Sequence, residues 1–257
     1  MRYCLHWHNF FGFDTRLSNK SFRMLPTLGL TTMYKSDQRL IILDADGTTI
    51  DAFSAITSTF SQHGMTLGNE DNFQKRHNLF KYMGGFKEFP RNFKKQISHR
   101  KGLIDTLTDV YRDEAQLYPG IAELVQRLID APDIVVGIVT RNITNEPLVT
   151  LSKLFLRHGI DVEHLDFLRH IPLKQNKIQA FKEMREQFGV NPALCYVCGD
   201  EHKDYDAAIA TGMHPFMVSY GFEDHQRLTD KFNVPEVLIA RTPVELSARV
   251  GHALHLK

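Results

Sequence analysis

The sequence predicts an α/β protein built on a doubly wound parallel sheet. Short apolar runs begin at residues 40, 134, 194 and 216, and such runs are typical of strands buried on both faces. Stretches with helical spacing lie between them, and this alternation favours parallel strands joined by crossover helices. Residues 52–117 interrupt the alternation after the first strand, because they contain few β-branched runs and many helix formers.

The elements of the core follow in a regular order. After the strand at 40–43, the chain resumes at 118–120, where Pro119 suits the first turn of a helix whose apolar residues begin at Ile121. A strand at 134–139 ends in Thr140, and a helix is expected at about 145–157. Further elements are expected as a short strand at 166–170, a helix from Ile178 to Phe188, strands at 194–200, 216–221 and 237–240, and a last helix at 242–254.

The interrupting segment is predicted to be all-helical. We expect helices at 52–63, from Asp71 as a candidate N-cap, and at 88–98 and 103–116, with a break at 84–85. It carries a basic cluster whose ordinary interpretation is a solvated helix face; recognition of an anionic substrate is the alternative. The cluster consists of Arg91, Lys94, Lys95, Arg100 and Lys101.

Composition limits the class of protein. The chain has 257 residues, 24% of them charged, and a net charge of +1, so it has no nucleic-acid footprint. The three cysteines form no disulfide framework, which favours a reduced, cytoplasmic setting, and Cys195 and Cys198 are expected in the core. No apolar run approaches the roughly 20 residues of a membrane span. Residues 1–38 have no clear period and are expected to form a loosely ordered extension.

Polar residues cluster where the predicted strands end. Asp44 and Asp46 follow the first strand directly, and Gly47 lets the chain turn away. In open α/β sheets, ligands bind at the carboxyl ends of the strands. Three more signals follow in order: Thr140, a lysine before the helix at 178, and the pattern Gly199-Asp200-x-x-x-Asp204.

Together with Asp44-x-Asp46-Gly47-Thr48, these signals resemble the four motifs of the haloacid dehalogenase superfamily of phosphohydrolases, in the phosphoglycolate phosphatase-like group. The resemblance implies a Rossmann-like core formed by residues 39–51 and 118–257. It also implies that residues 52–117 form an α-helical cap domain inserted after the first strand.

The resemblance also implies the chemistry. Asp44 is the expected nucleophile and Asp46 the general acid and base, with Thr140 and Lys174 holding the phosphoryl group. Mg²⁺ is the expected cofactor, with Asp44, Asp46, Asp200 and Asp204 as its site. Family members with this cap usually have Lys-Pro where this chain has Lys174-Gln175. Lys174 is preferred over Lys177, because Lys177 is expected to lie within the following helix.

The expected activity is magnesium-dependent hydrolysis of a small phosphate monoester through an aspartyl-phosphate, with a small phosphorylated metabolite as partner. A haloacid dehalogenase needs no second aspartate, so Asp46 argues against that activity. A phosphomutase of the β-phosphoglucomutase kind would keep all four motifs. A non-catalytic binding or regulatory protein would usually lose a motif residue. The sequence leaves the substrate, the choice between hydrolase and mutase, and the oligomeric state open.

Overall fold

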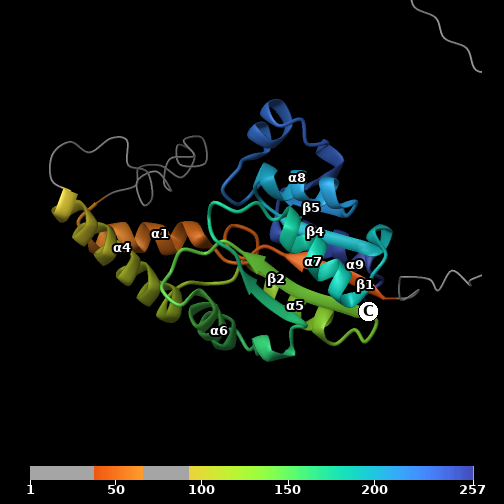
Figure 1. Cartoon of the computed structure of the whole chain (residues 1–257), viewed down its shortest axis with the longest axis horizontal. Helices are drawn as coiled ribbons and strands as arrows, with labels where there is room; N and C mark the ends of the chain where they lie inside the picture. Colours follow the sequence, from red (N-terminus) through yellow and green to blue (C-terminus); the bar gives the residue numbers. More distant parts are fainter. Residues whose placement is uncertain (1–37, 66–92, 257) are drawn as a thin grey trace, which may run out of the picture. The chain divides into compact units, whose positions relative to one another are not determined.

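A six-stranded parallel sheet forms the centre of the computed structural model, which describes residues 38–65 and 93–256, with residues 93–99 through their backbone alone (Figure 1). The strand order is β3-β2-β1-β4-β5-β6, and every neighbouring pair is parallel. The chain therefore starts in the middle and winds outward both ways, which confirms the predicted doubly wound fold. The strands are β1 (Arg39–Leu43), β2 (Ile134–Thr140), β3 (Phe167–His170), β4 (Cys195–Gly199), β5 (His214–Val218) and β6 (Ile239–Ala240).

Alternate residues of β1 belong to two different core layers. Ile41 and Leu43 pack in the cluster that includes α5 (Ile121–Ile129), α6 (Pro147–Arg157) and α9 (Pro243–Ala253). Leu40 and Ile42 pack in the cluster that includes α7 (Ile178–Phe188) and α8 (His202–Thr211). Successive side chains of a strand point to opposite faces. The continuous apolar run therefore reflects helices on both faces of the sheet.

The segment between β1 and β2 contains α1 (Ala52–Gln62) and α4 (Phe93–Asp113). Asp51 caps α1 by accepting a hydrogen bond from the backbone N–H of Ser54, and α1 packs against α4, which also contacts α6. The prediction of separate helices at 88–98 and 103–116 is wrong over the described residues, since α4 runs without a break through Gly102. The helix expected from Asp71 lies outside the described residues, as do the side chains of Arg91, Lys94 and Lys95.

The two ends of this segment are joined by backbone pairing. Ile50 forms an antiparallel bridge with Leu117. The N–H of Asp51 donates to the carbonyl oxygen of Gln116 at 2.9 Å, and the N–H of Tyr118 donates to that of Thr49 at 3.0 Å. The two ends of the segment therefore lie side by side, outside the strands of the sheet.

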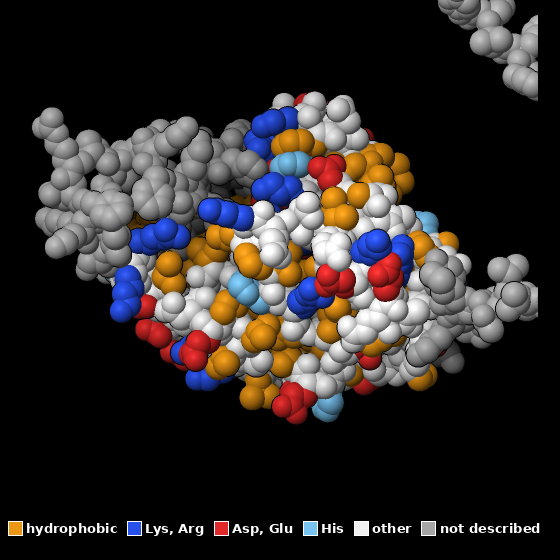
Figure 2. All heavy atoms as spheres, in the orientation of Figure 1, with side chains coloured by type: hydrophobic (Ala, Val, Ile, Leu, Met, Phe, Trp, Pro, Cys, Tyr) orange, Lys and Arg blue, Asp and Glu red, His pale blue; other side chains and the backbone are white. Residues whose placement is uncertain are grey.

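Short helical turns complete the described residues: η1 (Val162–His164), η2 (Pro192–Leu194), η3 (Arg227–Lys231) and η4 (Glu236–Leu238). Basic and acidic side chains lie scattered over the described part of the face in Figure 2. None of the helices in the described ranges is long and apolar enough to span a membrane. Apart from Gln38, the expected extension at 1–38 lies outside those ranges.

Candidate active site

Asp44 lies at the carboxyl end of β1, at the start of a loop that backbone hydrogen bonds stabilise. Its N–H donates to the carbonyl oxygen of Cys198 at 2.9 Å, which extends the pairing of β1 with β4. One carboxylate oxygen, Oδ1, accepts from the N–H of Ala45 at 2.9 Å. Gly47 turns the loop at φ +80°, and a Cβ there would lie 2.2 Å from the Asp200 carboxylate. Only glycine fits this close approach.

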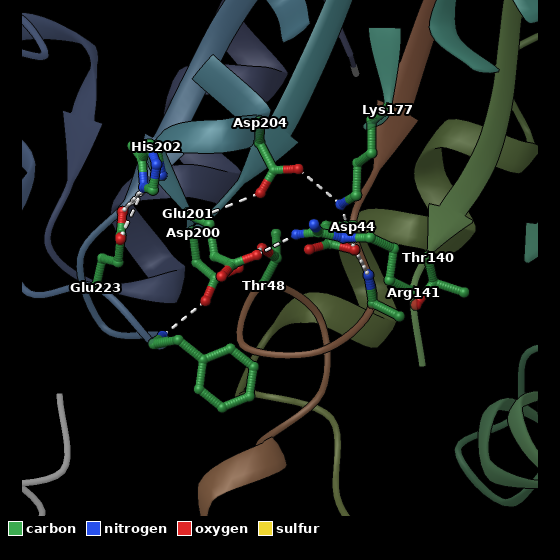
Figure 3. A network of polar contacts seen from close by, with 12 residues as sticks. Asp44, Thr48, Thr140, Arg141, Lys177, Asp200, Glu201, His202, Asp204 and Glu223 are labelled. Atoms are coloured by element: carbon green, nitrogen blue, oxygen red, sulfur yellow. Dashed lines mark hydrogen bonds and ion pairs between the residues drawn. The ribbon is translucent and has the colours of Figure 1, made fainter. Parts of the chain in front are cut away.

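Three buried carboxylates meet at this edge of the sheet. Asp44, Asp200 and Asp204 each offer an oxygen within 4.8 Å of the others (Figure 3). Asp200 follows β4 and accepts from the N–H of Phe222 at 2.6 Å and from the Thr48 hydroxyl at 3.3 Å. Asp204, in the first turn of α8, accepts from the N–H of Glu201 at 3.2 Å. These expected metal-site residues therefore lie together.

Lys177, rather than Lys174, lies among these carboxylates. Its Nζ is 2.7 Å from Asp44 Oδ1 and 2.6 Å from Asp204 Oδ1, and its side chain is 1% exposed. Lys174 is exposed. The geometry therefore favours Lys177 over Lys174 for this role. Lys177 does not lie within the following helix as expected, because α7 begins at Ile178 and Lys177 is its N-cap. From that position the side chain reaches back to the sheet edge.

Buried negative charge at the site exceeds what one lysine balances. Burial raises the pKa of Asp44 to about 7, although Lys177 opposes the shift. Burial, and then the charge of Asp44, raises the pKa of Asp200 well above its ordinary value. Burial lowers the pKa of Lys177, but Asp204 and Asp44 together shift it upward on balance. Oxygen donors with unbalanced charge are the ligand set that Mg²⁺ prefers, so the residues fit the expected metal.

The end of β2 supplies a second group of polar side chains. Thr140 is fully buried, and its hydroxyl accepts from the N–H of Asn142 at 3.1 Å. The next residue, Arg141, forms an ion pair with Glu201 and so links the loops after β2 and β4. Figure 3 shows Arg141 and Lys177 beside Asp44. Cationic groups therefore face the carboxylates from two loops.

The side chain of Asp46 makes contacts of a different kind. One oxygen accepts from the Tyr111 hydroxyl at 2.7 Å, and the Asn142 amide donates to both oxygens at 3.1 and 3.0 Å. Burial raises the pKa of Asp46, while the hydrogen bonds from Tyr111 and Asn142 lower it. The carboxyl thus faces α4 and the loop after β2.

Sequence reasoning missed several residues at this site. Asn142 could have been predicted, because it lies two positions after Thr140 in the loop that follows a predicted strand. Tyr111 carried no local signal, since 65 positions separate it from Asp46. Arg141 also forms an ion pair, with Glu201, that no motif spacing predicts.

A cavity of about 410 Å³ lies beside Asn142. Arg100 and Ile104 of α4 line one part of it, and the remaining lining comes from residues 142–147, His170 and Leu173. Of its charged residues, Glu146 pairs with Arg112 at 3.0 Å. Of the basic cluster predicted from the sequence, the side chains of Arg100 and Lys101 are described, and Arg100 lines this cavity.

Other candidate ligands have structural roles. Cys195 and Cys198 are buried free thiols in β4, and burial raises the pKa of Cys195 to about 12, so the expectation of core residues is confirmed. His202 contacts Glu223 at 2.9 Å and stacks on Phe232 at 3.7 Å between ring centroids. Its side chain is therefore engaged away from the three carboxylates.

Comparison with known families agrees with this geometry. Residues 41–218 match the model of the haloacid dehalogenase-like hydrolases. This match spans more than half of the chain, so the protein belongs to that family of hydrolases, and the resemblance inferred from the motifs is confirmed.

Individual relatives narrow the comparison. The phosphoglycolate phosphatase of Synechococcus elongatus is 25% identical over 199 residues, which cover 73% of this chain and 87% of that protein. A haloacid dehalogenase-like hydrolase from Streptococcus pneumoniae has a similar structure, with a TM-score of 0.59, 18% identity, and coverage of 84% of this chain and 99% of that one. A candidate β-phosphoglucomutase from Thermotoga maritima has a TM-score of 0.58 and 18% identity, with the same coverage of the two chains. At these identities the two structures support the fold alone.

Proposed function

We propose that the protein hydrolyses small phosphate monoesters through an aspartyl-phosphate on Asp44. Uncatalysed hydrolysis of phosphate monoesters is extremely slow, so a catalyst must supply a placed nucleophile and neutralise charge. The observation that carries the proposal is the meeting of Asp44, Asp200 and Asp204 at the carboxyl edge of the sheet, with Lys177 paired to the first and the last of them. The similarity to a phosphoglycolate phosphatase supports it.

Two carboxylates divide the chemistry. Asp44 would attack phosphorus and become the phosphorylated residue. Asp46 would give a proton to the leaving oxygen and then take one from the water that hydrolyses the intermediate. Thr140 would donate a hydrogen bond to a phosphoryl oxygen. Lys177, in the place first expected of Lys174, would balance the charge of the phosphoryl group and of Asp44.

Magnesium is the proposed cofactor. Asp44 and Asp200 would hold it with their carboxylates and Asp46 with its backbone carbonyl, while Asp204 would support a metal-bound water and orient Lys177. When bound, Mg²⁺ lowers the repulsion between an anionic phosphate and the attacking carboxylate.

The segment from 52 to 117 is proposed to act as the cap, which excludes water from the site. Its helix α4 reaches both Asp46, through Tyr111, and the cavity, through Arg100. The alcohol part of the substrate would occupy that cavity. Arg100, a described cation in its lining, favours a small substrate with a second anionic group.

The test is phosphate release by the purified chain from p-nitrophenyl phosphate and a panel of phosphorylated metabolites, with Mg²⁺ or with EDTA. We expect release with Mg²⁺, little with EDTA, and poor replacement by Ca²⁺, which prefers more ligands and longer bonds. Asp44→Asn should lose about 10⁴-fold or more in turnover, as expected when a nucleophile is removed. Its circular dichroism spectrum and melting temperature should stay close to those of the wild type.

Each alternative predicts a different outcome. If sugar monophosphates are isomerised faster than phosphate is released, the protein is a mutase and not a hydrolase. Metabolite binding without turnover in any assay would indicate a binding protein. Near-normal activity of Asp44→Asn would refute the proposed mechanism.

A further inference from the structure

Asp46 is held from two sides by side chains that no family motif supplied. The Tyr111 hydroxyl lies 2.7 Å from its Oδ1, and the Asn142 amide lies 3.1 and 3.0 Å from its two oxygens. An aspartate on a loop has several rotamers of similar energy, and three hydrogen bonds restrict it to one. These donors therefore fix where the carboxyl lies.

Both donors are themselves fixed. Tyr111 is 2% exposed, lies near the end of α4, and its carbonyl oxygen accepts from Arg157 Nη2 at 3.3 Å. The Asn142 side-chain oxygen accepts from the N–H of Thr144 at 2.9 Å, which directs the amide nitrogen toward Asp46. Asn142 belongs to the core loop, whereas Tyr111 belongs to the segment between β1 and β2. Among the described hydrogen bonds of Asp46, the one from Tyr111 connects it to α4.

We propose that Tyr111 is a positioning residue whose hydroxyl holds the Asp46 carboxyl for proton transfer to the leaving oxygen and ties that transfer to the placement of α4. The proposal rests on the proposed phosphatase function. It needs no contact between Tyr111 and substrate, because the tyrosine acts through Asp46. Displacement of a proton donor by about 1 Å can cost about 100-fold in rate.

The activity test compares leaving groups in Tyr111→Phe. An alkoxide leaves poorly without a proton, whereas p-nitrophenolate leaves with little help from a general acid. We expect kcat/KM for an alkyl phosphate substrate to fall at least about tenfold more than kcat/KM for p-nitrophenyl phosphate. Asp46→Ala should also lower kcat/KM more for the alkyl phosphate than for p-nitrophenyl phosphate. This difference should be larger than in Tyr111→Phe, because general acids contribute about 10²–10⁴-fold.

Tyr118→Phe is the matched control. Its hydroxyl lies 3.4 Å from the carbonyl oxygen of Tyr220, so this substitution removes a phenolic oxygen that bonds to backbone instead of Asp46. We expect no split between the two substrates. If Tyr111→Phe loses equal activity on both substrates, or behaves like Tyr118→Phe, the positioning role is overturned.

A second measurement does not depend on turnover. In a double-mutant cycle of Tyr111→Phe and Asp46→Ala, urea unfolding midpoints should be non-additive, with the tyrosine substitution costing less when Asp46 is already absent. Additive midpoints would overturn the contact itself. If the wild-type chain releases no phosphate from any monoester, the proposed function fails and the proton-transfer role with it. Coupling in the cycle would then show that the failure lies in the function and not in the contact.

Discussion

Lys177 and Lys174 show how much one position can matter at the start of a helix. Lys177 is buried between Asp44 and Asp204, whereas Lys174 is exposed. A sequence can place a helix start only to within a few residues. Here α7 begins at Ile178, so Lys177 is its N-cap and not part of its interior, and the geometry favours Lys177 over Lys174.

Replacing each lysine by methionine tests this assignment. Lys177→Met leaves Asp44 and Asp204 without the cation that contacts both of them. We expect the free energy of unfolding to fall by about 3–5 kcal/mol and most of the activity to be lost. Lys174→Met is the matched control and should change both by little, because surface substitutions stay within about 0.5 kcal/mol. Urea denaturation and phosphate release measure the two effects. Loss of activity in Lys174→Met alone would reverse the assignment.

At the scale of elements, the strands were predicted well and α4 was not. Apolar runs placed β1 and β2 to within one residue, because strands buried on both faces have continuous apolar sequences. Gly102 lowered the helical signal in the middle of α4, and two helices were expected. Packing against α1 and α6 carries the helix through the glycine, and such packing cannot be read from local sequence.

Gly102→Ala should therefore stabilise the protein. Its backbone has no positive φ, and among the described atoms an added Cβ would meet the edge of the His63 ring, at 3.7 Å. In a helix interior, alanine is better than glycine by about 0.5–1 kcal/mol. Urea denaturation should show this gain with activity unchanged. Gly47→Ala is the contrasting variant, because its Cβ would collide with Asp200, and it should lose stability and activity. A loss of stability in Gly102→Ala would mean that α4 is broken there.

At the scale of the site, the sequence predicts most of the candidate catalytic residues but not the side-chain contacts between them and the rest of the protein. Asp44, Asp200 and Asp204 follow strand ends, and the ends of parallel strands meet at one edge, so sequence order alone brings them together. The contact of Tyr111 with Asp46 depends on how α4 packs. No spacing in the chain encodes that packing.

At the scale of the whole molecule, the buried carboxylates couple stability to pH. Asp44 has a pKa of about 7 in the folded protein and an ordinary value of 3.8. Between these two values the folded state binds more protons than the unfolded state. The contribution of Asp44 to stability therefore falls as pH rises from about 4 to about 7 and then levels off.

Mg²⁺ should reverse this loss, since it binds ionised carboxylates and competes with protons. We expect the rise in melting temperature on adding Mg²⁺ to be larger at pH 8 than at pH 5. Differential scanning fluorimetry in Mg²⁺ and in EDTA measures it, and Asp200→Asn should reduce the rise at pH 8. An equal rise at both pH values would show that the metal does not bind at these carboxylates.

Residues 1–32 provide a last prediction, from sequence. They lack a clear apolar period, and the family match begins only at residue 41. Deletion of residues 1–32 should leave activity and melting temperature nearly unchanged. A fall of more than about 5 °C, roughly 1 kcal/mol or more for a chain of this size, would show that the segment packs on the rest.

The pairing of Ile50 with Leu117 has a consequence for how such chains can change. Since the two ends of the segment pair with each other outside the sheet, we expect changes in its length to leave the register of the strands unchanged. A transplanted segment from a relative would join at the same two positions. To keep Asp46 in place, the donor segment would have to bring its own hydroxyl to the position of Tyr111, and this requirement limits which transplants retain activity.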